Sequence, residues 1–132
     1  MATQKVFISY DYDNDRGYKN LLIAWSKNSD FDFFVNDQST DISIDSTNAG
    51  VVRRAISAAI SGSTYFLCLV GRNTHKSTWV GWEIRKAIEL GKRLIVVKID
   101  TTNTTPSALL NQRANWAMSF SFDAIKKALD SA

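Results

Sequence analysis

Two short apolar runs, 65–70 and 94–99, constrain the fold of this chain more than any other feature. The first contains no polar residue, and the second is interrupted only by Lys98. Strands with one face in solvent alternate between apolar and polar residues, whereas strands covered on both faces read as continuous apolar runs. Both segments are therefore predicted to be central strands of a parallel sheet with helices on each side.

Elsewhere the apolar residues switch repeatedly between the strand period and the helix period. Val6–Ile8 and Phe31–Val35 are predicted strands, and an edge strand is expected to carry Trp116, Met118 and Phe120. Four helices are predicted from residues that recur at the helical period. The apolar face of the first is formed by Tyr18, Leu21, Leu22 and Trp25, and that of the second by Val52, Ala55, Ile56, Ala59 and Ile60, after the expected caps Ser46, Thr47 and Asn48. The face of the third is formed by Val80, Ile84, Ala87, Ile88 and Gly91, and that of the fourth by Ile125 and Leu129.

Five strands that alternate with helices predict one α/β domain over residues 1–132. The expected architecture is a flavodoxin-like three-layer sandwich with a five-stranded parallel sheet in the order 2-1-3-4-5. Cys68 and Trp116 are expected to be core residues without a chemical role.

The charge and the single cysteine exclude several classes of function. The net charge is only +3, from 16 basic and 13 acidic residues, and no basic cluster is interleaved with aromatic residues, so nucleic acid is not an expected partner. No apolar stretch is long enough for a signal peptide or a membrane span. One cysteine excludes a disulfide within the chain, and a cytoplasmic location is expected.

The loop after the first predicted strand, 10–17, does not match the common ligand-binding loops. Its one glycine comes too late to cradle a phosphate, which argues against a Rossmann-type redox cofactor. Asp11, Asp13 and Asp15 alternate as in a calcium loop, but Gly17 is one place too far and Leu22 stands where the bidentate glutamate should be. A solvated acidic loop that caps a helix is expected instead.

Two further chemistries lack the residues they need. A response-regulator receiver requires an aspartate at the end of the third strand, where this chain has Leu69-Val70-Gly71-Arg72. The single histidine, His75, lies among polar residues and is expected to be exposed. With one histidine and one buried cysteine, neither nucleophilic catalysis of the Ser-His or Cys-His kind nor a metal site is expected.

The residues that carry a candidate site are Trp79 and Glu83, four apart near the start of the third predicted helix. Side chains with this spacing lie on the same side of a helix. The helix follows the most apolar strand, and ligands of open α/β sheets bind at the carboxyl ends of the strands. Glu83 is expected at the border between core and solvent. The alternative is a helix-surface glutamate paired with Arg85 or Lys86, with Trp79 covering the rim of the core.

One carboxylate is enough for one particular class of glycosidic bond cleavage. Ordinary glycosidases use two carboxyl groups, one of which protonates the leaving group. The nicotinamide of NAD already carries positive charge and leaves as a neutral molecule, so a single anion that stabilises the developing oxocarbenium ion could suffice. The pair is compatible with NAD cleavage without singling it out.

Three stretches resemble the TIR superfamily, and specifically its short bacterial and archaeal TIR-like domains: Val6-Phe7-Ile8-Ser9-Tyr10, Ser63 through Gly71, and Trp79-Val80-Gly81-Trp82-Glu83-Ile84. Within the superfamily the chain is most similar to the TIR-like subunit of Thoeris anti-phage systems. The resemblance implies an enzyme without a cofactor that converts its substrate NAD, by attack of adenine on the ribosyl cation, into a cyclic ADP-ribose isomer. That nucleotide would activate a separate effector protein.

The resemblance also implies the residues of the site and the partners. Glu83 would be the catalytic carboxylate and Trp79 its neighbour in the pocket. The other residues expected to bind the substrate are Phe7, Ser9, Tyr10, Asp11, Asp37 and Arg72. Self-association through TIR surfaces and a phage-derived trigger are expected. The loop 35–40 lacks the Arg-Asp-x-x-Pro-Gly pattern of animal TIR adaptors, which argues against an adaptor role in animals. A non-catalytic TIR scaffold or nucleotide-binding module is the alternative function.

Overall fold

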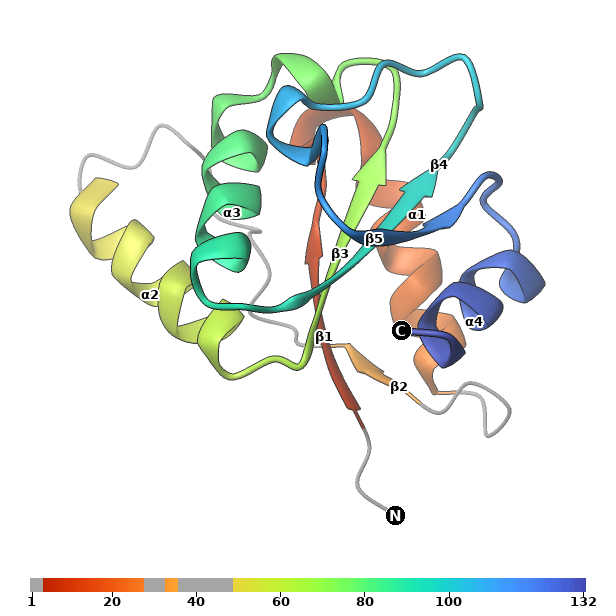
Figure 1. Ribbon diagram of the computed structural model, residues 1–132, viewed down its shortest axis with the longest axis horizontal. Helices are drawn as coiled ribbons and strands as arrows, with labels where there is room; N and C mark the ends of the chain where they lie inside the picture. The colour runs from red at the N-terminus through yellow and green to blue at the C-terminus, as the bar shows by residue number, and fades with distance from the viewer. Residues whose placement is uncertain (1–3, 28–32, 36–48) are drawn as a thin grey trace.

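The computed structural model of the protein describes residues 4–27, 33–35 and 49–132 (Figure 1). Its elements in chain order are β1 (Gln4–Ser9), α1 (Tyr12–Ser26), β2 (Phe33–Val35), α2 (Ala49–Ser61), β3 (Tyr65–Val70), the 3₁₀ turn η1 (Thr74–Lys76), α3 (Thr78–Glu89), β4 (Arg93–Lys98), the 3₁₀ turn η2 (Ser107–Leu109), β5 (Ala114–Ala117) and α4 (Phe122–Asp130).

The strands form one parallel sheet in the order β2-β1-β3-β4-β5, which is the order expected from the sequence. In the central pairs, Ser9 of β1 lies opposite Cys68 of β3, and Cys68 lies opposite Val96 of β4. The predicted run at 65–70 coincides with β3, whose six residues are all buried. The fold is thus an α/β fold with a parallel sheet, in an arrangement consistent with a flavodoxin-like architecture.

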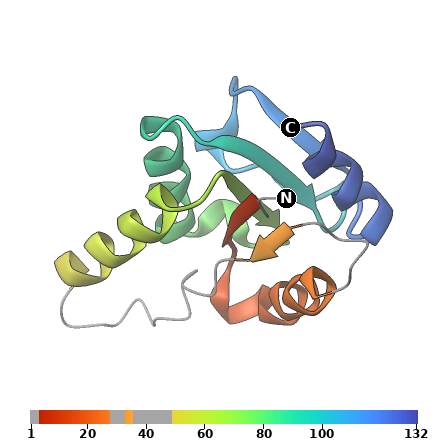
Figure 2. The same cartoon turned by 90° about the horizontal axis from the view of Figure 1, so that it is seen from below.

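Helices cover both faces of the sheet (Figures 1 and 2). α1 and α4 pack on one face, where Leu22 and Ile125 meet Ile8 and Leu67. α2 and α3 pack on the other face, where Ile56 and Ile84 lie in the cluster that contains the stacked rings of Phe7 and Phe66. Burial of each such large side chain stabilises the fold by about 1.5–3 kcal/mol, so these two apolar layers hold the sheet between its helices.

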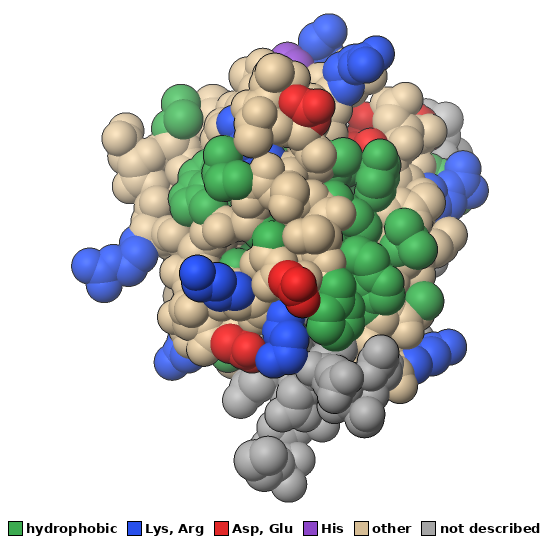
Figure 3. Space-filling model, turned by 90° about the vertical axis from the view of Figure 1, so that its right-hand side faces the viewer, with side chains coloured by type: hydrophobic (Ala, Val, Ile, Leu, Met, Phe, Trp, Pro, Cys, Tyr) green, Lys and Arg blue, Asp and Glu red, His purple; other side chains and the backbone are tan. Residues whose placement is uncertain are grey.

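The edge of the sheet at β5 differs from the prediction. β5 spans only four residues, so Met118 and Phe120 lie beyond it. Trp116 is 40% exposed and is not a core residue, because it stands on the outermost strand, where no other element of the described residues covers it. In the space-filling view of Figure 3, which faces the right-hand side of Figure 1, hydrophobic side chains gather on the visible surface.

Two smaller expectations about the helices are wrong, and others fall on residues that the structure does not describe. Ala55 is exposed rather than part of the inner face of α2. α1 begins at Tyr12, so most of the segment 10–17 is helix rather than loop. The expected caps Ser46, Thr47 and Asn48, and the first two residues of the predicted strand 31–35, lie outside the described residues. In the described part of the chain, no helix has the length and apolar character needed to span a membrane.

Candidate functional site

Glu83 lies inside the protein, at the side of the sheet where the strands have their carboxyl ends. α3 begins after Ser77, whose hydroxyl caps the helix by accepting a hydrogen bond from the backbone N–H of Val80 at 3.2 Å. Glu83 follows in the second turn of α3, and only 2% of its surface is exposed. Ser9, the last residue of β1, donates a hydrogen bond from its Oγ to Glu83 Oε1 at 2.7 Å.

This position corrects the expectation that Glu83 would lie between core and solvent. The alternative of a glutamate on the helix surface is also wrong, because Glu83 is buried, and Lys86 pairs with Glu89 at 3.0 Å. Glu83 is buried because α3 packs close to both β1 and β3, which brings its second turn over the end of the sheet. Burial of a carboxylate is costly unless it is hydrogen-bonded, so such a residue is often retained for its chemistry.

The Cys68 thiol is the apolar neighbour of this pair. It lies opposite Ser9 in the sheet and is completely buried. Burial, and then the nearby negative charges of Glu83 and Asp15, raise the pKa of the Cys68 thiol well above its usual range. Cys68 therefore stays protonated and acts as a core residue, as expected from the sequence.

Asp15 supplies a second buried carboxyl group at the same edge of the sheet. It belongs to the first turns of α1, where its backbone departs from helical geometry with φ −116° and ψ 15°. Thr74 Oγ1 accepts from the backbone N–H of Gly71 at 2.8 Å, and its one hydroxyl proton is shared between the carbonyl oxygen of Leu69 at 3.2 Å and Asp15 Oδ2 at 3.4 Å. Only 6% of the Asp15 surface is exposed, so the expectation of a solvated acidic loop is wrong at this residue.

We expect Asp15→Asn to stabilise the protein at neutral pH. Burial, and then the charge of Asp11, raise the pKa of Asp15 above its ordinary value of 3.8. The folded state therefore binds the proton of the Asp15 carboxyl group more tightly than the unfolded chain does. The stability that this proton contributes is lost as the pH rises through the folded-state pKa of Asp15. Thermal unfolding should show a melting temperature higher by on the order of a few degrees at neutral pH. The gain should vanish below pH 3.8, and a gain that grew in acid would contradict this electrostatic account.

Trp79 lies one helical turn before Glu83 and is partly buried at the rim of the apolar layer under α2 and α3. Its ring meets the ring of Trp82 edge to face, with 5.7 Å between the centroids. The guanidinium of Arg53, on α2, lies 5.6 Å from the centre of the Trp79 ring. Trp79 thus combines an aromatic surface with an adjacent cation close to the start of α3.

The structure separates the other predicted site residues. Phe7 is completely buried and stacks on Phe66, so it supports the sheet rather than lining a pocket. Tyr10 is 5% exposed and points into the opposite layer, with the Lys19 ammonium 5.5 Å from its ring. Asp11 stands at the N-cap of α1 and accepts a hydrogen bond from Asn14 at 2.6 Å. Of these residues around the end of β1, Ser9 is the one whose hydrogen bond to Glu83 defines the site.

Arg72 and Asp37 are the two remaining residues of the predicted site. Arg72 follows β3 and is exposed. Hydrogen bonds from Thr102, and to a smaller extent the charge of Arg72, lower the pKa of Asp100. Asp37 lies outside the described residues. Among the described residues, no three His, Cys, Asp or Glu side chains are grouped so that they could hold a metal ion.

Sequence reasoning missed the contribution of Gly71 and Thr74. Gly71 comes directly after the apolar run of β3, and an added Cβ there would lie 2.6 Å from Asp15 Oδ1. A glycine directly after a buried strand, with a threonine three residues later, was the available signal. The partner, Asp15, is 56 residues away from Gly71 in sequence, and no local pattern links the two.

The fold is similar to that of several solved structures. A CMP N-glycosidase from Clostridium botulinum, BcmB, aligns with a TM-score of 0.65 at 15% identity, over 97% of this chain and 98% of that chain. The 2-desoxiribosyltransferase from Leishmania mexicana aligns with a TM-score of 0.57 at 15% identity, over 92% and 93% of the two chains. The TIR domains of the activated Roq1 resistosome, which directly recognizes the pathogen effector XopQ, align with a TM-score of 0.51 at 18% identity, over 75% and 60%.

These structural likenesses, all below 25% identity, establish the fold. A search of curated protein sequences found no significant match. The family model of the Thoeris protein ThsB, TIR-like domain, matches residues 7–104, which include the second half of β1, all of α3 and the pair Ser9 and Glu83. That match covers well over half of the chain, and the resemblance noted in the sequence is confirmed. The chain belongs to the family of TIR-like domains of the Thoeris protein ThsB.

Proposed function

We propose that this protein is an anti-phage TIR enzyme that cleaves NAD and forms a cyclic ADP-ribose-type nucleotide, which activates a separate effector protein. Membership of the Thoeris family supports the role in defence. The observation that carries the chemistry is the buried carboxylate of Glu83, held by the Ser9 hydroxyl at the carboxyl edge of the sheet. NAD is the substrate in this proposal, and no cofactor takes part.

The proposed reaction replaces one bond to the ribose carbon C1 by another. The bond from C1 to the nicotinamide nitrogen breaks, and its electron pair leaves with nicotinamide, which becomes neutral. The Glu83 carboxylate stabilises the positive charge that develops on C1 and the ring oxygen. A nucleophilic atom of the same ADP-ribosyl group, such as an adenine nitrogen, then bonds to C1, and any proton it loses passes to Glu83 or to solvent. Exclusion of water favours ring closure over hydrolysis.

The position of the site supports this assignment. Ligands of open α/β sheets bind outside the carboxyl ends of the strands, and Ser9 ends β1 at that edge. Trp79, one turn before Glu83, offers an aromatic surface for nicotinamide or adenine. The structurally similar protein BcmB is named as a CMP N-glycosidase, so the fold is compatible with cleavage of a bond between a sugar and a base. Self-association and a phage-derived trigger belong to the same proposal.

Incubation of the purified protein with NAD tests the proposal. Mass spectrometry should detect nicotinamide together with a cyclised ADP-ribose species, and CMP in a parallel reaction should stay intact. Because the trigger belongs to the proposal, the reaction is run with and without lysate from phage-infected cells. Cleavage of CMP but not NAD would replace this proposal by a nucleotide N-glycosidase. No turnover under either condition would favour the alternative of a non-catalytic TIR scaffold.

We expect Ser9→Ala to lower the rate of NAD cleavage by roughly ten- to a hundredfold, since a hydrogen bond to a charged group contributes about 1.5–3 kcal/mol. Ser9 acts through Glu83, so kcat should fall while KM changes little. Steady-state kinetics with NAD separates the two constants. A matched control is Ser61→Ala, because this serine is exposed at the end of α2. An unchanged kcat in the Ser9→Ala variant would show that the hydroxyl does not position the carboxylate.

A further inference from the structure

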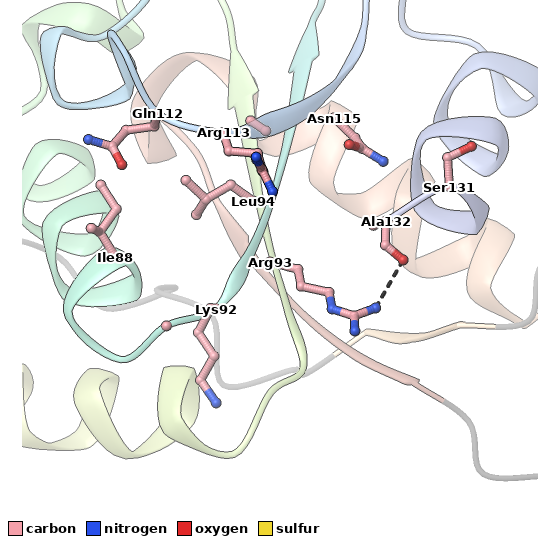
Figure 4. Close-up of a pocket in the computed structure, with 11 residues that line it drawn as sticks. Ile88, Lys92, Arg93, Leu94, Gln112, Arg113, Asn115, Ser131 and Ala132 are labelled. Atoms are coloured by element: carbon pink, nitrogen blue, oxygen red, sulfur yellow. Dashed lines mark hydrogen bonds between the residues drawn. The ribbon is translucent and has the colours of Figure 1, made fainter.

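A second candidate site lies at the opposite end of the strands, where β4 and β5 begin (Figure 4). A hollow of about 460 Å³ opens there between the end of α3 and the end of α4. This volume falls in the range of small-molecule pockets. Glu83 and Ser9 lie at the edge where the strands end, whereas this hollow lies at the starts of β4 and β5, so the two sites do not overlap.

The hollow contains two arginines from neighbouring strands. Arg93 and Arg113 come directly before Leu94 and Ala114, which are paired across the parallel strands β4 and β5, so the backbones of the two arginines are neighbours. Both side chains are exposed, and the described lining residues include no aspartate or glutamate. Like charges on directly neighbouring strand positions repel each other. Arg93 already donates to the main-chain oxygen of Ala132, so Arg113 is the arginine that leaves positive charge for a bound anion to neutralise.

The hydrogen bonds of the basic residues show which of them can meet a ligand. Lys92 donates to the carbonyl oxygen of Ser61 at 2.9 Å and points away from Arg113 in Figure 4. Arg93 Nη1 donates to the carbonyl oxygen of Ala132 at 3.0 Å, which fixes its guanidinium at the wall of the hollow. A guanidinium has five N–H donors, so most of those on Arg93 stay available. Arg113 makes no hydrogen bond or ion pair with another described residue.

The remaining side chains that line the hollow are not charged. Ile88 and Leu94 form an apolar wall on the α3 side, and both belong to the apolar layer under that helix. Gln112 and Asn115 add amide groups near the arginines. A pocket with one apolar wall and a small number of convergent polar groups is typical of a site for a small organic ligand. A guanidinium group matches the charge and the oxygen geometry of a phosphate.

We propose that this hollow binds a small phosphorylated organic molecule, with Arg113 on the phosphate and the organic part against Ile88 and Leu94. The site is separate from the proposed NAD-cleaving site and does not depend on it. A ligand there would contact the ends of α3 and α4 together, so it would stabilise the folded protein by binding.

AMP is a suitable probe, because it joins one phosphate to an organic base, and adenosine is its matched control without the phosphate. Nuclear magnetic resonance titration with AMP should shift the backbone amide signals of Arg93, Gln112, Arg113 and Asn115. Arg113→Gln should weaken this binding at least about tenfold, whereas Arg85→Gln, an exposed arginine on the outer side of α3, should leave it unchanged. Adenosine should bind at least about tenfold more weakly than AMP, because it lacks the charged group.

Three results would overturn the proposal: shifts confined to residues around Ser9 and Glu83, AMP affinity unaffected by Arg113→Gln, or equal affinities for AMP and adenosine. Arg113 is exposed, so circular dichroism should show that the variant folds normally. NAD cleavage by Arg113→Gln distinguishes this proposal from the proposed function. Retained cleavage together with lost AMP binding supports a separate site, whereas loss of both to the same extent contradicts it.

Discussion

Replacing Glu83 by glutamine is expected to reduce NAD cleavage on the order of a thousandfold or more without unfolding the protein. The carboxylate is the group that would stabilise the positively charged transition state, and an amide of the same shape cannot do so. Glutamine keeps an oxygen that can accept the 2.7 Å hydrogen bond from Ser9 Oγ. The substitution also removes a negative charge from a residue that is 2% exposed, so the melting temperature should stay the same or rise.

Glu89→Gln is the matched control for this substitution. Glu89 lies on the same helix, but its side chain is exposed and pairs with Lys86 on the surface. Exposed ion pairs contribute only about 0–1 kcal/mol, so both activity and stability should change little. Nicotinamide release and thermal unfolding are measured for both variants. Full activity of the Glu83→Gln variant would remove the carboxylate from the mechanism.

The second large effect is expected at Gly71, where alanine should destabilise the protein by about 1–3 kcal/mol. Gly71 is buried, and an added Cβ would lie 2.6 Å from Oδ1 and 2.7 Å from Cγ of Asp15. Asp15 has little freedom to move away, because it is buried and accepts a hydrogen bond from Thr74. Relief of the clash would therefore displace the contact between α1 and the end of β3. Urea or thermal unfolding measures the loss.

Gly17→Ala provides the control for this prediction. Gly17 lies inside α1, is exposed, and has no atom within 4 Å of an added Cβ. Alanine there should stabilise the helix by about 0.5–1 kcal/mol. The double variant Asp15→Ala with Gly71→Ala should recover much of the loss, since the clashing side chain is gone. If Gly71→Ala were as harmless as Gly17→Ala, the close packing of Asp15 on this glycine would be wrong.

The central strands could be predicted from the sequence because burial on both faces leaves a local mark. The run 65–70 coincides with β3, and the run 94–99 differs from β4 by one residue at each end. The edge strand β5 contains no such continuous apolar run. The alternation of Trp116, Met118 and Phe120 predicted a longer strand with Trp116 inside, but β5 ends at Ala117 and leaves that ring exposed.

The candidate site could be predicted only in part for a similar reason. The spacing of Trp79 and Glu83 places both on one side of α3, but the depth of Glu83 depends on how α3 packs over β1 and β3, which is a tertiary property. Its hydrogen bond to Ser9 joins residues 74 positions apart. Asp15 was misjudged because its acidic neighbours Asp11 and Asp13 suggested a solvated loop, whereas its burial depends on Gly71 and Thr74, far along the chain.

The central claim is that Glu83 converts NAD into a cyclic signalling nucleotide during infection. Mass spectrometry of nucleotides from phage-challenged cells that carry either the natural protein or the Glu83→Gln variant tests it most directly. We expect a cyclised ADP-ribose species only in cells with the natural protein. If these cells resisted the phage while neither strain formed a new nucleotide, the protein would act as a scaffold or nucleotide-binding module, and the enzymatic account would be wrong.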